Sequence, residues 1–153
     1  MTEHDIDERN AATAQLLVYG GYIPFGVLTL FFILPEISPF SRPDNLLLLI
    51  AYSAVILSFL GGIRWGFATL RNDRASAREL LTSVVPSLIG WMCLTLPSAP
   101  ALVMLAITFV WHYLWDRRHA EKHALPRWFL PLRARITLAV APTLLIAAIA
   151  IIV

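Results

Sequence analysis

Residues 46–70 decide the fold: LLLLIAYSAVILSFLGGIRWGFATL. Arg64 is the single charged residue in this stretch. A helix rises about 1.5 Å per residue and must cross about 30 Å of hydrocarbon, so about 20 apolar residues make a transmembrane helix. The stretch therefore predicts a helix that spans a membrane.

Four further apolar segments precede or follow it in the sequence. They cover residues 15–35, 80–96, 101–115 and 136–153. The pattern predicts an all-α fold, a bundle of five transmembrane helices forming one domain over residues 15–153. Residues 1–14 are polar and acidic, and we expect them to form a cytoplasmic tail.

Composition agrees with a membrane protein. The 153 residues are 58% hydrophobic and only 14% charged, whereas a soluble domain has about 25% charged residues. The net charge of +2 and the position of basic residues beside apolar segments argue against nucleic-acid binding. Cys93 is the only cysteine, which excludes an intramolecular disulfide and a site built from several thiolates. The acidic N-terminus resembles neither a secretory signal nor a mitochondrial presequence, so we expect the first apolar segment to be retained.

The basic residues predict an orientation. Arg42 flanks the segments on one side, and Arg64 lies within a segment. The other ten flank the opposite side: Arg9, Arg71, Arg74, Arg78, Arg117, Arg118, Lys122, Arg127, Arg133 and Arg135. Because cytoplasmic loops are enriched in lysine and arginine, this bias predicts a cytoplasmic N-terminus and an external C-terminus.

Small residues recur every four positions in the second segment, at Ala54, Ser58, Gly62 and Gly66. Such spacing lets two helix backbones approach closely. One interpretation is a homodimer seam, and the other is packing against a different helix of the same chain. Prolines at positions 24, 86 and 142 fall inside other segments, where they act either as hinges or as static kinks.

A polar layer is expected around Arg64, because a charge within hydrocarbon is costly unless it is paired or reaches water. Residues from the other segments fall at comparable depth: Tyr19, Tyr22, Ser83, Ser87, His112, Asp116 and Thr137. His112 and Asp116 are four residues apart and share a helix face. The layer is either a site for a lipid headgroup, quinone or small anion, or a region where Asp116, carbonyls or lipid phosphate satisfy Arg64.

Cofactor and catalytic signatures are missing from the sequence. His119 and His123 are four residues apart, but too few further ligands lie nearby to complete a metal site. The sequence contains no phosphate-binding glycine loop, nucleophile elbow or HExxH motif. We therefore predict no catalytic residues, no metal and no cofactor.

Several stretches together resemble a known family. They are residues 19–26 (YGGYIPFG), 58–68 (SFLGGIRWGFA), 85–91 (VPSLIGW) and 125–128 (LPRW). They are similar to the domain-of-unknown-function 3429 (transmembrane protein 69-like) family. The resemblance implies a multi-span protein of bacterial or mitochondrial inner membranes, here a bacterial one, and it carries over no catalytic residue.

Two functional hypotheses follow. The first is a non-enzymatic accessory or assembly factor of a larger inner-membrane complex, motivated by the small size and the small-residue seam. The alternative is a carrier or binding protein for a lipid, quinone or small solute at the Arg64 layer. The expected partners are the lipid bilayer and other inner-membrane proteins.

Overall fold

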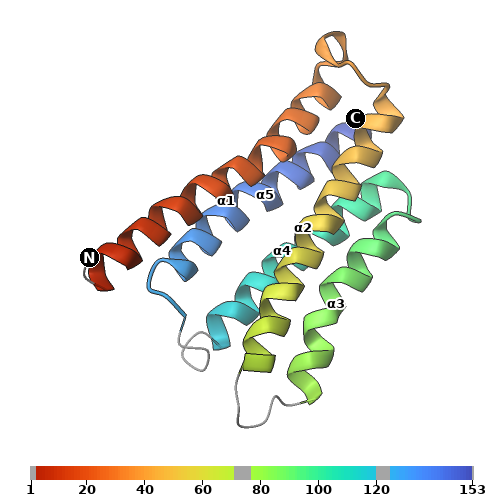
Figure 1. Ribbon diagram of the computed structural model, residues 1–153. Helices are drawn as coiled ribbons and strands as arrows, with labels where there is room; N and C mark the ends of the chain where they lie inside the picture. Colours follow the sequence, from red (N-terminus) through yellow and green to blue (C-terminus); the bar gives the residue numbers. More distant parts are fainter. Residues whose placement is uncertain (1–2, 71–76, 120–124, 153) are drawn as a thin grey trace.

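The computed structural model describes residues 3–70, 77–119 and 125–152, and helices are the only regular secondary structure within these ranges (Figure 1). The elements are α1 (Glu3–Ile33), a short 3₁₀ turn η1 (Pro35–Ile37), α2 (Arg42–Leu70), α3 (Ala77–Cys93), α4 (Ser98–His119) and α5 (Phe129–Ile152). The prediction of an all-α fold is confirmed.

Four of the described helices are long and apolar enough to cross a membrane: α2, α5 and the segments Arg9–Ile33 of α1 and Ser98–Arg118 of α4. The chain is therefore a multi-pass integral membrane protein. Helix α3 has 17 residues. At 1.5 Å per residue it is about 26 Å long, slightly less than the thickness of a typical hydrocarbon core.

All five helices begin earlier than the sequence suggested, and the difference is largest for α1 and α5. Helix α1 starts at Glu3, so the polar segment from residue 3 to residue 14 continues the first apolar helix. Helix α5 starts at Phe129, seven residues before the predicted start at residue 136. Pro131 lies in the first turn of α5, where the missing N–H removes no helical hydrogen bond. Arg133, which we expected in a loop, is therefore inside a helix.

The helices form a ring in chain order, in which each helix packs against its neighbours in sequence and α5 packs against α1 (Figure 1). Helix α2 also contacts α4 across the ring, whereas α2 and α5 are not close-packed neighbours. The core is aliphatic and aromatic. Phe25 of α1 lies at its centre, with ring-centroid distances of 5.1 Å to Tyr52 and 5.9 Å to Phe109.

Glycines bring α2 and α3 into close contact. A Cβ built on Gly90 would lie 2.9 Å from the Cα of Ala54, and one built on Gly61 would overlap the carbonyl oxygen of Ser83. No described atom beyond its own helix lies within 4 Å of a Cβ built on Gly62 or Gly66. Of the predicted seam, only Ala54 takes part in this contact.

Helix geometry explains the difference. At about 100° per residue, each step of four residues drifts about 40° around the axis, so Gly66 lies about 120° from Ala54. Gly61, seven residues after Ala54, lies only about 20° away. The contact within the chain therefore runs through Ala54 and Gly61. Ser58 and Gly62 are exposed on the bundle surface, and the homodimer interpretation of that face stays a prediction.

Candidate functional site

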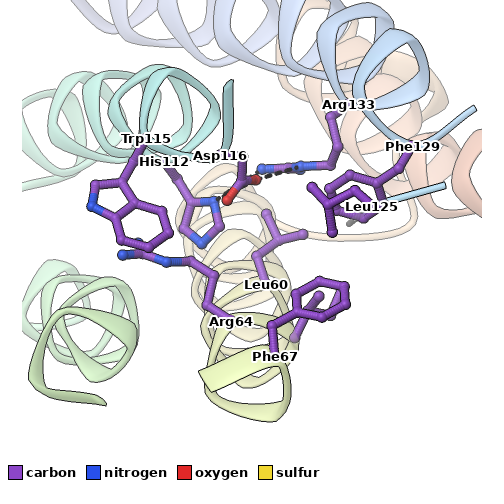
Figure 2. A pocket seen from close by; sticks show the side chains of 10 residues that line it. Leu60, Arg64, Phe67, His112, Trp115, Asp116, Leu125, Phe129 and Arg133 are labelled. Carbon is purple, nitrogen blue, oxygen red and sulfur yellow. Dashed lines mark hydrogen bonds and ion pairs between the residues drawn. The ribbon is translucent and has the colours of Figure 1, made fainter. Parts of the chain in front are cut away.

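A buried ionic cluster joins α4 and α5 (Figure 2). The Nε of Arg133 donates to the Oδ2 of Asp116 at 3.2 Å, and the Nδ1 of His112 lies 3.2 Å from the same oxygen. The Nη2 of Arg133 lies 3.1 Å from His112 Nδ1. All three side chains are at least nine-tenths buried.

The tautomer of His112 decides which of these contacts is a hydrogen bond. Because a guanidinium only donates, Nδ1 accepts from Arg133 when it carries no proton, and it donates to Asp116 when it does. In both cases Asp116 neutralises Arg133 inside the bundle. Truncating one member would leave an uncompensated buried charge, which is costly.

Arg64 lies beside this cluster but has different partners. Its Cζ atom is 3.4 Å from the ring centroid of Trp115, and Nη2 donates to Thr82 Oγ1 at 3.2 Å. Figure 2 shows the guanidinium lying across the indole. Such cation–π stacking is strongest when the cation is desolvated. Arg64 is only 5% exposed, so it does not reach out toward the lipid headgroups.

Of the expected layer, Arg64, His112 and Asp116 all line the small cavity, whereas the other members have different surroundings. Tyr19 is 46% exposed, and the hydroxyl of Tyr22 lies 2.8 Å from Thr143 Oγ1 on α5. Ser83 donates to the carbonyl oxygen of Leu80 at 2.6 Å. Ser87 lies against Gly61 at the α2–α3 contact.

Sequence reasoning missed Arg133, Trp115 and Thr82. The apolar pattern places Arg133 in a cytoplasmic loop, because the fifth apolar segment begins only at residue 136. Pro131 was the available signal, since proline favours the first turn of a helix and would have placed Arg133 one turn inside it. Thr82 and Trp115 offered no signal that distinguishes a partner of Arg64 from an ordinary residue.

The space inside the cluster is small. A cavity of about 10 Å³ lies between Arg64, His112, Asp116 and Arg133. This volume is close to the minimum that holds one water molecule. Arg64 Nε, Arg64 Nη1 and His112 Nε2 have no hydrogen-bond partner among the described residues. The cluster therefore has room for a bridging water, and it is too small for a lipid headgroup, a quinone or any comparable molecule.

No group of three metal-ligating side chains occurs in the parts of the chain that the structure describes. His123 lies outside the described residues, and only the backbone of His119 is described.

A much larger groove opens on the other side of the cluster. Its volume is about 500 Å³. One face of α1, one face of α2, Phe109 of α4 and the beginning of α5 line it. The lining residues of α1 are Ala14, Leu17, Val18, Gly21 and Phe25, those of α2 are Ile56, Phe59, Leu60 and Ile63, and those in and just before α5 are Trp128, Phe129, Leu132, Arg133, Ile136, Thr137 and Val140. The lining is apolar except for Arg133, Thr137 and the indole of Trp128. Four residues line both the groove and the small cavity: Leu60, Ile63, Phe129 and Arg133.

The comparison with known proteins agrees with this architecture. The family model described as "Protein of unknown function (DUF3429)" matches residues 10–149. The chain belongs to the DUF3429 family. This DUF3429 protein is 34% identical over 145 residues to a protein named "Transmembrane protein 69" from Xenopus tropicalis. The match covers 90% of this chain and 54% of that relative, so the chain spans about half the length of the relative. No solved structure matches it.

Proposed function

We propose that this DUF3429 protein is a non-enzymatic membrane protein that binds the hydrocarbon part of a membrane-dissolved molecule in the groove between α1 and α2. The groove is the observation that carries the proposal. Its volume of about 500 Å³ falls within the range of about 300–1,000 Å³ typical of ligand sites.

The walls of the groove support this assignment. Leu17 of α1 and Phe59 of α2 line it and are 70% and 64% exposed. Exposed apolar side chains of transmembrane helices face lipid, so the groove opens sideways into the bilayer. A hydrophobic molecule can enter from the membrane without crossing water, and an apolar lining favours its hydrocarbon chain.

For the membrane context, we propose five spans in a bacterial inner membrane, with the N-terminus in the cytoplasm and the C-terminus outside. The bias of basic residues toward one side supports this orientation. In this arrangement the cytoplasmic half of the bundle holds the ionic cluster and the part of the groove that Trp128 lines.

Filling the groove tests the proposal. Val18 lines the groove, whereas Ile23, five residues further along α1, is 61% exposed and lies outside it. Val18→Trp is therefore the test variant, and Ile23→Trp is its matched control. Native mass spectrometry of the chain purified in mild detergent should find a co-purified lipid-soluble molecule on the wild type and the control and not on Val18→Trp. Equal retention by all three proteins would contradict the proposal.

A second candidate function, an accessory or assembly factor, rests on the exposed face of α2. Ser58 and Gly62 are exposed, and no described atom of another helix approaches Gly62 or Gly66. Small residues of this kind let a transmembrane helix of another protein approach closely. Co-purification from membranes should recover a partner with the wild type that Gly62→Leu loses while remaining folded. A variant that retains the same partners as the wild type would argue against this function.

A further inference from the structure

We propose that the molecule bound in the groove carries a hydrogen-bond-accepting carbonyl, which receives a hydrogen bond from the hydroxyl of Thr137, and that it belongs to the class of lipid-soluble quinones. The inference rests on the proposed function and names the chemistry of the ligand.

Thr137 is the decisive residue because its hydroxyl is buried without a partner. It lines the groove and is only 4% exposed, and its Oγ1 makes no hydrogen bond to any described residue. Two other buried threonines donate to the carbonyl oxygen four residues earlier: Thr108 to Met104 at 2.7 Å and Thr143 to Ala139 at 2.9 Å. Thr29 of α1 also lacks a described partner, but it does not line the groove. A buried hydroxyl without a partner is unfavourable. Because Thr137 lines the groove, a rotation of its side chain would turn the hydroxyl toward an acceptor on a groove ligand, and the hydrogen bond would then form.

The depth of Thr137 narrows the class of ligand. Helix α5 has 24 residues. It is therefore about 36 Å long and extends about 3 Å beyond a 30 Å hydrocarbon core at each end. Thr137 lies eight residues after Phe129, about 12 Å along the axis and thus about 9 Å below the hydrocarbon boundary. The ester carbonyls of a phospholipid stay at the interface, so they do not reach this depth.

Charge narrows the class further. Arg133, one helical turn from Thr137, is neutralised by Asp116 at 3.2 Å. The groove therefore offers no uncompensated cation to a fatty-acid carboxylate or a phosphate, and an anion at this depth would be penalised. A neutral ring with carbonyl oxygens and a long apolar chain satisfies both conditions, because its chain fills the groove and its carbonyl reaches Thr137.

The test compares a quinone with a hydrocarbon of similar shape. Tritiated decylubiquinone is titrated onto the full chain in mild detergent, and decylbenzene, which has no carbonyl, serves as competitor. Thr137→Val removes the hydroxyl while keeping the side-chain shape, and Thr108→Val, at a hydroxyl bonded within its own helix, is the control. We expect Thr137→Val to weaken decylubiquinone binding about fivefold, Thr108→Val to leave it unchanged, and decylbenzene to bind both variants as it binds the wild type.

The melting midpoint of Thr137→Val without ligand serves as a control for folding. It should equal that of the wild type, because removing an unpaired hydroxyl should not destabilise the bundle. Equal affinity of the wild type and Thr137→Val for decylubiquinone, with Val18→Trp still reducing it, would overturn the quinone assignment and leave the groove as a binding site. The same conclusion follows if only phospholipid is retained. Absence of binding of both probes to the wild type, with no co-purified molecule, would overturn the proposed function as well.

Discussion

Adding one methyl group to adjacent glycines of α2 should have opposite effects on stability. In Gly61→Ala the new Cβ overlaps the carbonyl oxygen of Ser83, whereas in Gly62→Ala it meets no described atom of another helix. Both changes gain the same helix propensity, about 0.8–1.0 kcal/mol. Overpacking at Gly61 costs about 1–3 kcal/mol, because the obstacle is backbone and the two helices must separate.

The expected difference between the two variants is therefore about 1–3 kcal/mol, with Gly61→Ala the less stable. Propensity cancels in the comparison, so the difference isolates the contact between α2 and α3. The free energy of unfolding can be measured by titrating sodium dodecyl sulfate into mixed micelles and following tryptophan fluorescence. Gly90→Ala tests the same contact from α3 and should also be destabilising, because its Cβ would lie 2.9 Å from Ala54 Cα. If Gly61→Ala proved as stable as Gly62→Ala, the described contact between the helices would be wrong.

Three further predictions concern the ionic cluster and the topology. Asp116→Ala should destabilise the bundle by about 3–5 kcal/mol in the same unfolding assay, because it leaves a buried guanidinium unpaired; a loss below 1 kcal/mol would mean that water solvates the cluster. Arg64→Lys keeps the charge but loses the planar stack on Trp115, so it should lower the free energy of unfolding by about 1–2 kcal/mol. The double variant Arg64→Lys/Trp115→Leu should lose less stability than the sum of the two single variants. Strict additivity would show that the two side chains do not interact. Alkaline phosphatase fused to the C-terminus should be active and a fusion at Asp73, outside the described residues, inactive, and the reverse pattern would contradict the proposed orientation.

The sequence predicted the all-helical class and the apolar part of each helix, but not where the helices begin. Membrane insertion depends on length and apolarity, which are read directly from the chain. It also predicted that Arg64, His112 and Asp116 would lie close together, since depth in the membrane follows from counting residues. Rotation around a helix axis was harder to predict. The predicted seam and the contact between α2 and α3 both contain Ala54, but the four-residue pattern turns away from this contact around the helix axis. The pattern therefore pointed to Gly62, whereas Gly61 makes the contact.

The partner of Asp116 could not be predicted from the sequence for a related reason. Arg64 and Arg133 both fall near Asp116 in depth, but only the start of α5 decides which one reaches the carboxylate. That start depends on how far a helix continues beyond its apolar part, and apolarity says nothing about it. The groove could not be predicted, because it arises where α2 and α5 fail to meet, which depends on all the packing angles together.

The groove and the small cavity share four lining residues, Leu60, Ile63, Phe129 and Arg133, and this has a consequence for the effect of ionic strength. Mobile ions weaken the attraction between exposed charges beyond about 8 Å at physiological salt, but they do not enter a space lined by hydrocarbon. The pair of Asp116 and Arg133 is 7% exposed at each residue and borders that space. Concentrated salt should remove anionic lipids and peripheral proteins from the basic ends of the helices. It should leave the attraction between Asp116 of α4 and Arg133 of α5 intact.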